Sequence, residues 1–265
     1  MTALLTLRGS ATLPLSTGAI VRFRRSSLLI AEIPVTDLAR ISVLPDVISV
    51  DEDSYAYPCL DQSAADVGVA SARQRFAVTG KGVLVAIIDS GIDWRHQNFR
   101  TAEGKTRIKY ILDLSLAGAY YGGRIITEAE INQALESSGD IGHHDYAGHG
   151  THVAGIAAGD GSGEGGYGLY CGMAPEADLL IVKATRQTST SSFKSSDQII
   201  ALSFIDSVAA VLNQPYVANL SFGGHAGAHD GTSPVERFID QLAGVNKPGK
   251  VIVTVAPSFG ERYLS

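Results

Sequence analysis

Three short segments of the chain are almost continuously apolar, which is typical of strands buried on both faces of a parallel sheet. They cover residues 83–88, 179–182 and 251–255. Segments of helical length lie between them, over residues 152–158, 196–212 and 234–242. Strands that alternate with helices predict an α/β fold, with a parallel sheet flanked by helices and joined by right-handed crossovers. Glycine-rich stretches near 118–123 and 159–168 predict loops.

The beginning of the chain has a different pattern, with short segments rich in β-branched residues. Residues 19–23, 28–33 and 47–50 predict strands. Pro34 to Asp37 marks a helix start, which an apolar-periodic run follows. These elements predict a small α+β unit over residues 1–55. A unit of this size gains stability when it docks onto a larger one.

The boundaries of the larger part follow from composition. An acidic run, Asp51 to Asp53, and then Tyr57-Pro58 indicate the end of the small unit. Residues 56–72 are interpreted as a linker, and residues 73–265 as the α/β domain.

Composition narrows the class of protein and its partners. With 45% hydrophobic and 18% charged residues, the chain resembles ordinary globular proteins. The formal net charge of −6 gives no general attraction to nucleic acid or to an anionic membrane. Two cysteines, Cys59 and Cys171, exclude a disulfide-rich scaffold. No stretch of about 18 apolar residues occurs, so no membrane span is expected. No Sec signal peptide is evident, which leaves a cytoplasmic protein or export by another route.

Two motifs carry candidate chemistry. In the first, Asp89 follows the apolar segment 83–88, so its carboxylate is expected at the carboxyl end of a buried strand. In the second, His149 stands in Gly-His-Gly-Thr-His, with small residues behind it, at the start of a predicted helix. A carboxylate can orient an imidazole and stabilise its cation, and the imidazole can then activate a hydroxyl.

Together the two motifs resemble those of the subtilisin-like serine proteases (peptidase S8, bacterial type). Asp89 in IIDSGID and His149 in GHGTHVAG are similar to the Asp and His motifs of that family. Further similar segments follow in the expected order, at residues 172–177, 180–183 and 218–224. Residues 32–52 are similar to the inhibitory prodomain that precedes many such enzymes. The resemblance implies a subtilisin-like sheet, preceded by a prodomain-like unit.

The resemblance also implies roles for individual residues. Asp89 would orient His149, and His149 would act as general base and then as general acid to the leaving amine. Ser221, Phe222 and Gly223 would bind the main chain of a protein or peptide substrate as an added strand. The chain's own prodomain-like unit would lie in the same cleft. The chemistry requires no cofactor; structural calcium is common in the family, but no metal ligands are assigned here.

Two departures from the family pattern bear on activity. Ser258 stands at the position of the oxyanion asparagine, where its shorter side chain reaches less far. Loss of one oxyanion donor typically costs about 10²–10³ in turnover. The G-T-S-x-A segment that carries the nucleophilic serine in the family does not follow. Residues 73–265 are therefore interpreted as an incomplete peptidase domain, truncated before that serine, and the chain alone is expected to be inactive.

Two local features have alternative interpretations. Ser233, in Asp-Gly-Thr-Ser-Pro, is either a relocated nucleophile or the N-cap of a helix with Pro at N1 and Glu236 at N3. The N-cap is favoured. His143 and His144, close to Asp145, are either metal ligands or part of a polar loop, and the polar loop is favoured.

Two functions from different classes are therefore carried forward. The first is a subtilisin-like serine endopeptidase whose nucleophile is absent from this chain. The alternative is a catalytically inactive pseudoprotease that acts as a peptide-binding or regulatory module. Asp89 and His149 favour an enzymatic ancestry, whereas Ser258 and the missing serine motif favour inactivity.

Overall fold

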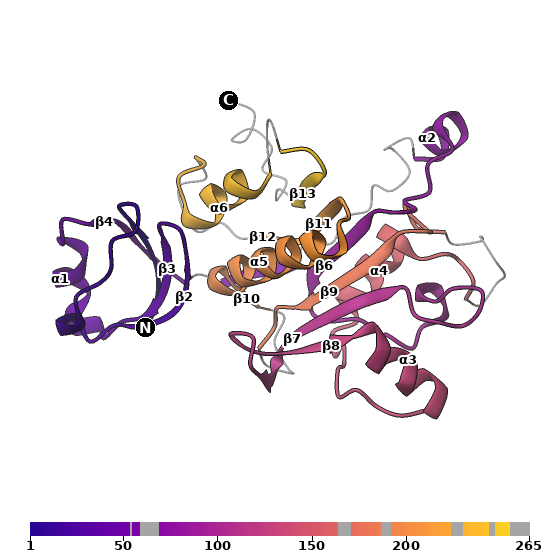
Figure 1. The fold of residues 1–265 in the computed structure, drawn as a ribbon, viewed down its shortest axis with the longest axis horizontal. Coiled ribbons are helices and arrows are strands. Elements are labelled where there is room, and N and C mark those ends of the chain that lie inside the picture. The colour runs from indigo at the N-terminus through magenta and orange to yellow at the C-terminus, as the bar shows by residue number, and fades with distance from the viewer. Residues whose placement is uncertain are drawn as a thin grey trace.

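A six-stranded sheet forms the centre of the α/β part of the chain (Figure 1). The structure is a computed structural model that describes residues 1–53, 55–58, 69–163, 171–186, 192–223, 230–243 and 247–254. The strand order is β13 (Lys250–Thr254), β11 (Tyr216–Leu220), β6 (Leu84–Asp89), β9 (Asp178–Lys183), β7 (Ile108–Gly118) and β8 (Gly122–Thr127). The first five run parallel, and β8 pairs antiparallel with β7 at the edge. The predicted α/β fold with a parallel sheet is confirmed, with one antiparallel strand added.

The loop predicted near residues 118–123 is present but shorter, over residues 119–121. β7 continues to Gly118 and β8 begins at Gly122, so only the tip of a β-hairpin remains. Glycine permits this because the two backbones approach very closely. A Cβ at Gly118 would lie 2.3 Å from the carbonyl oxygen of Gly123.

Helices cover both faces of the sheet, as the alternation of side chains along β6 shows. Leu84, Ala86 and Ile88 pack in one core cluster with α5 (Ser195–Leu212) and α6 (Pro234–Leu242). Val85 and Ile87 pack in a second cluster with α3 (Glu128–Ser137) and α4 (His149–Ala158). Successive side chains of a strand point to opposite faces, so the clusters form two layers on either side of the sheet. Burial on both faces explains the continuous apolar sequence of β6.

The N-terminal residues form a second, four-stranded antiparallel sheet (Figure 1). Its order is β2 (Ile20–Arg25), β3 (Leu28–Glu32), β1 (Thr2–Leu7) and β4 (Val47–Glu52). On one face Leu5 and Leu7 pack with Ile41 of α1 (Leu38–Ser42). On the other face Leu4 and Phe23 join the core cluster of α5. The N-terminal sheet therefore shares a hydrophobic core with the α/β part.

Residues 55–58, most of which were assigned to the linker, form a strand instead. β5 (Tyr55–Pro58) lies between β10 (Phe193–Lys194) and β12 (Phe222–Gly223) and pairs antiparallel with both. No sequence pattern marks it, because both partners are two residues long and distant in sequence. α2 is Val69–Phe76, and three-residue 3-10 helices lie at Leu15–Thr17, Val35–Asp37 and Gln97–Phe99.

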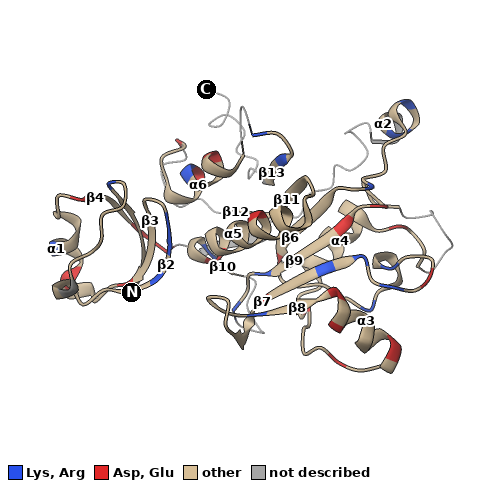
Figure 2. Ribbon diagram, in the orientation of Figure 1, with Lys and Arg blue, Asp and Glu red and all other residues tan. Residues whose placement is uncertain are grey.

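α5 is the one helix, within the described ranges, with the length and apolar character of a membrane span. However, 67% of it is buried inside the protein, and the core helix of a globular protein passes the same test. Figure 2 shows α5 almost entirely in the colour of uncharged residues, in contrast to the acidic residues on α3. Its apolar character is explained by the two layers that it joins, the N-terminal sheet and the central sheet.

Candidate active site

Asp89 is the last residue of β6, at the carboxyl edge of the central sheet. Ligand sites of open α/β sheets lie along this edge. The Asp89 side chain is fully buried, and a buried carboxylate is stable only when it accepts hydrogen bonds. Asp89 Oδ1 accepts the Ser90 N–H at 2.7 Å, and both carboxylate oxygens face His149. Asp89 is therefore held rigidly at the edge where chemistry is expected.

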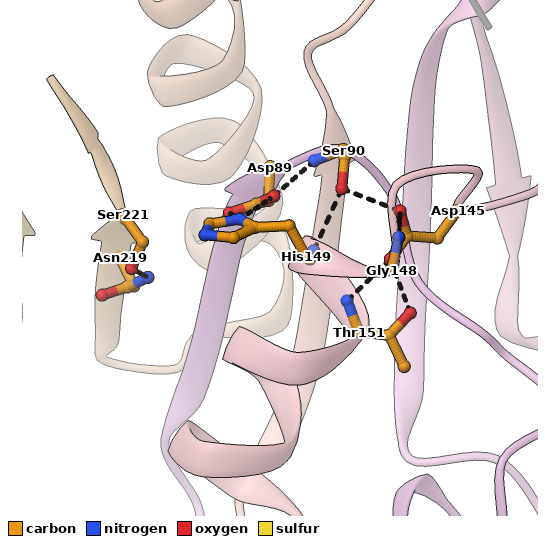
Figure 3. A network of polar contacts seen from close by, with 9 residues as sticks. Asp89, Ser90, Asp145, Gly148, His149, Thr151, Asn219 and Ser221 are labelled. Carbon is orange, nitrogen blue, oxygen red and sulfur yellow. Dashed lines mark hydrogen bonds and ion pairs between the residues drawn. The ribbon is translucent and has the colours of Figure 1, made fainter. Parts of the chain in front are cut away.

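His149 is the first residue of α4, and its ring faces Asp89 (Figure 3). His149 Nδ1 lies 2.8 Å from Asp89 Oδ1 and 2.9 Å from Oδ2. The Nδ1–H group donates to the carboxylate, so the lone pair of the neutral ring is on Nε2. His149 Nε2 is buried and has no hydrogen-bond partner among the described residues. The ring thus has one oriented nitrogen and one nitrogen available as a base.

Two glycines bring the start of α4 against the loop after β6. Gly148 is the N-cap of α4 and has a φ of 72°, a conformation that other residues rarely adopt. A Cβ at Gly150 would lie 2.2 Å from the carbonyl oxygen of Gly91 and 3.1 Å from Asp89 Cβ. Gly148 is therefore favoured by its left-handed backbone conformation, and Gly150 by the close packing that brings the ring to Asp89.

The charges around His149 favour its action as a general base. The hydrogen bond with Asp89 raises the pKa of His149 above its ordinary value, and burial of the ring offsets part of this rise. The charges of Asp89 and Asp145 act in the same direction as the hydrogen bond. Both carboxylates favour the imidazolium form, which is the form that a general base reaches after taking a proton.

A second His–Asp pair holds the loop that follows Asp89. His143 Nδ1 lies 2.6 Å from Asp113 Oδ2, and both side chains are buried. His143 Nε2 accepts the Ile92 N–H at 3.1 Å, so the ring proton is on Nδ1 and both nitrogens are occupied. His143 lies in the loop before α4, as the sequence suggested, but its side chain is buried and has a structural role. The described part of the chain contains no group of three or more His, Cys, Asp or Glu side chains that could hold a metal.

The sequence does not indicate the contact between Asp113 and His143, and it assigns no individual role to Lys183. Lys183 ends β9 and lies directly opposite Asp89 on β6 and Asp113 on β7 in the sheet register. Its side chain is buried, and Nζ donates to the His144 carbonyl at 2.6 Å. Burial lowers the pKa of Lys183, and the charges of Asp113 and Asp145 oppose this. The only available sequence signal was a lysine at the end of an apolar strand.

The three expected substrate-binding residues lie at the end of β11 and in β12. Ser221 Oγ accepts a hydrogen bond from Asn219 Nδ2 at 2.7 Å, and Asn219 is on β11, which pairs with β6 (Figure 3). Phe222 and Gly223 form β12, which pairs with β5. The Phe222 ring stacks on Phe193 of β10 at a centroid distance of 4.2 Å. This edge therefore accepts an extended segment of the chain itself.

Ser233, the alternative candidate for the nucleophile, has a structural role. Ser233 is the N-cap of α6: its Oγ accepts the Glu236 N–H, the Glu236 carboxylate accepts the Ser233 N–H, and Pro234 is at the first turn. The predicted capping box is confirmed. Ser258 and Cys59 lie outside the described residues.

Comparison with known proteins gives one consistent family. Residues 80–257 match the sequence profile of the Subtilase family, Peptidase_S8. The chain is similar to the structure of the Clostridium perfringens CspB protease, with 34% identity and a TM-score of 0.62 over 70% of this chain and 38% of that one. It is also 26% identical to the PI-type proteinase of Lactococcus lactis subsp. cremoris over 205 residues, 74% of this chain and 10% of that protein.

Bacillus subtilis proteases also match over shorter stretches. The major intracellular serine protease is 37% identical over 107 residues, 40% of this chain and 25% of that protein. The minor extracellular protease Epr matches as well, at 33% identity over 146 residues. The similar proteins thus include intracellular and extracellular proteases, and they do not determine a compartment. The chain spans 10% of the length of the lactococcal proteinase and 25% of the length of the major intracellular protease.

Proposed function

Since the chain belongs to the subtilase family, we propose that it is part of a serine endopeptidase in which Asp89 and His149 are two members of the catalytic triad. One observation carries the proposal: a fully buried carboxylate binds His149 Nδ1, while Nε2 has no hydrogen-bond partner among the described residues. In a Ser-His-Asp triad, Nε2 is the atom that takes the proton of the nucleophilic hydroxyl.

The proposed mechanism follows from this geometry. Asp89 holds His149 in the tautomer whose Nε2 is unprotonated, and it stabilises the imidazolium that forms. His149 takes the proton from a serine hydroxyl as that oxygen attacks the peptide carbonyl. It then gives the proton to the leaving amine, and a water molecule repeats the sequence on the acyl-enzyme. Nothing in these steps requires a cofactor.

We place the nucleophile outside the described residues. Ser233 is engaged in the capping box of α6, where its hydroxyl accepts a backbone N–H. Ser221 lies between β11 and β12, and its hydroxyl accepts a hydrogen bond from Asn219. Neither hydroxyl donates to His149 Nε2. The position of the oxyanion donor, assigned to Ser258, remains a prediction.

The substrate is proposed to bind as an added strand between β10 and β12. β5 occupies this place in the structure and pairs with both strands through its backbone. Backbone pairing of this kind gives affinity for an extended peptide without fixing its sequence. Ser221, Phe222 and Gly223 are then the residues that meet the substrate main chain on one side.

The N-terminal unit, residues 1–55, is proposed to be an inhibitory prodomain that docks on residues 73–265. Its sheet shares a core with α5 through Leu4 and Phe23. Arg25 of β2 donates to Asp206 of α5 at 3.0 Å. The residues after β4 lead directly into β5, so docking of the unit places a strand in the proposed substrate site. Release of this strand would be needed before a substrate could bind.

The second candidate is a peptide-binding module without hydrolysis. The pairing of β5 with β10 and β12 supports it, because strand addition needs no nucleophile. The two candidates differ in one measurable property: the endopeptidase has a reactive serine, and the peptide-binding module has none.

A fluorophosphonate probe tests the proposal on the protein produced from its own gene. We expect the probe to label one serine, and peptide mapping to place the label outside the described residues. The His149→Ala variant should lose the labelling, since removal of one triad residue typically costs about 10⁴-fold or more. Ser233→Ala is the matched control and should be labelled normally, with a loss of roughly 1 kcal/mol of helix stability.

Other outcomes would overturn the proposal. A label on Ser233 would make that residue the nucleophile. No labelling, together with binding of an extended peptide in competition with the N-terminal unit, would establish the peptide-binding module. Labelling of the 265-residue chain alone at any serine of the described residues would likewise contradict the proposed place of the nucleophile.

A further inference from the structure

Asp145 lies in the segment that precedes α4, four residues before His149, and its carboxylate accepts four hydrogen bonds (Figure 3). Oδ1 accepts the Ser90 hydroxyl at 2.7 Å and the Gly148 N–H at 3.0 Å. Oδ2 accepts the Thr151 N–H at 2.8 Å and the Thr151 hydroxyl at 2.7 Å. A carboxylate offers about four acceptor sites, so this one is fully used.

The link through Ser90 reaches the loop that holds Asp89. Ser90 Oγ donates to Asp145 and accepts the Gly150 N–H at 3.0 Å, so it joins the loop after β6 to the first turn of α4. The Ser90 backbone N–H donates to Asp89 Oδ1 at 2.7 Å. A single serine therefore touches the carboxylate that orients His149 and the backbone of the residue after His149.

The link through Thr151 closes the network on the other side. Thr151 Oγ1 donates to Asp145 and accepts the Asp93 N–H at 2.8 Å. Its own N–H is one of the first amides of α4, which have no partner within the helix. The N-cap residue, Gly148, has no side chain to supply that partner. Asp145 does so in its place, and it puts a negative charge at the helix N-terminus.

We propose that Asp145 is a positioning residue for His149: it fixes the start of α4 to the loop after β6, and it supplies a second negative charge near the imidazole. The first role sets the geometry of the Asp89–His149 hydrogen bond. The second supports the imidazolium form of the ring. The role of His149 as the base is taken from the proposed function, whereas the contacts of Asp145 do not depend on it.

The charge distribution is consistent with both roles. Burial by itself would raise the pKa of Asp145, but the hydrogen bonds from Thr151, Ser90 and Gly148 outweigh it and lower that pKa. Asp145 is therefore ionised at neutral pH. Among the described residues, Asp89 of β6 and Asp145 of the loop before α4 are the charged groups that act on His149, and both raise its pKa.

The test is an NMR titration of the histidine rings in the full chain, with Asp145→Asn compared to Asp140→Asn. Asn keeps the shape but removes the charge and one of the two acceptor oxygens. The chain has seven histidines, so the His149 signal is assigned by its loss in His149→Gln. We expect Asp145→Asn to lower the pKa of His149 by roughly 0.5–1 unit, as for loss of a nearby opposite charge.

Asp140→Asn is the matched control, since Asp140 is in the same segment and its side chain is 52% exposed. It removes the same charge, but its contacts are with Arg95, Gly142 and His144 rather than with Ser90 or Thr151. We expect a change in the His149 pKa below roughly 0.2 unit, because an exposed charge is screened. Equal shifts in both variants would overturn the proposal.

A second variant separates positioning from simple support of the fold. Ser90→Ala keeps the charge of Asp145 but breaks the link to Gly150, and it also serves if Asp145→Asn does not fold. We expect the His149 Nδ1 proton to exchange with water at least tenfold faster, while the circular dichroism stays that of the native chain. Native exchange in Ser90→Ala, or a native His149 pKa in a folded Asp145→Asn, would show that Asp145 only caps α4. The titration reads the ring directly, so either result is independent of whether the chain hydrolyses peptides.

Discussion

The connection between the N-terminal unit and α5 gives a prediction that can be worked out in detail. Asp53 follows β4, and its carboxylate accepts the Ser196 N–H at 2.7 Å and the Ser196 hydroxyl. Ser196 is the second residue of α5, whose N-cap position is held by Lys194, a residue without a side-chain acceptor. Asp53 therefore caps an 18-residue helix from another part of the chain.

The perturbation is Asp53→Asn. It leaves one acceptor oxygen, turns an NH₂ group towards a donor, and removes a negative charge from the helix N-terminus. Hydrogen bonds to a charged group contribute about 1.5–3 kcal/mol, and loss of a helix cap costs about 0.5–2 kcal/mol. These two estimates describe the same contact, so we expect a loss of about 2 kcal/mol in the free energy of unfolding. Asp53 is buried, so water cannot fully replace the lost bond.

The assay is equilibrium unfolding in urea. With a slope on the order of 3 kcal/mol/M for a chain of this size, the midpoint should fall by roughly 0.7 M. Asp46→Asn is the control, because Asp46 is an exposed residue of the same N-terminal unit. Hydrogen exchange should also become faster at the backbone of β5, which follows Asp53. Midpoints that agree within about 0.2 M for the two variants would refute the reasoning.

Two further predictions concern His149. Gly150→Ala places a Cβ 2.2 Å from the Gly91 carbonyl oxygen, so α4 must shift. The His149 pKa, measured by NMR titration, should then fall towards its ordinary value. Gly155→Ala is the control and should leave the titration unchanged, because a Cβ there meets nothing within 4 Å. Because folding raises the His149 pKa, its stabilising contribution is fully present below the unfolded pKa of about 6.5 and is lost as pH rises through the folded pKa. The urea midpoint of the wild type should therefore fall relative to that of His149→Gln above pH ~6.5, and a constant difference between pH 5.5 and 8.5 would contradict this.

The sequence was most informative where local pattern and burial coincide. β6 is apolar along its length because both of its faces are covered, and Asp89 interrupts that pattern at the carboxyl end of the strand. Of the two glycines around His149, Gly150 marks a close approach of backbone that leaves no room for a Cβ, and Gly148 marks a positive φ. Ser233 and Glu236 form a capping box within one turn, so their spacing alone predicted the contact.

Contacts between distant segments were not predictable in this way. The Asp113–His143 pair joins residues 30 positions apart, and neither flanking sequence requires the other. β5 pairs with two strands too short to leave a periodic pattern. α3 is a different case, because Thr127 and Glu130 have the spacing of a capping box, a local signal that marks this helix start in the sequence.

The position of β6 within the sheet has a consequence for synthesis of the chain. β6 is complete at Asp89, but it pairs with β9 and β11, and β11 ends only at Leu220. At about 5–20 residues per second, a ribosome needs roughly 7–26 s to make those 131 residues. During this time an apolar strand lacks a neighbour, whereas the N-terminal sheet is complete at Glu52. The yield of folded chain should therefore depend on translation rate and on chaperones that shield β6, whatever the stability of the finished fold.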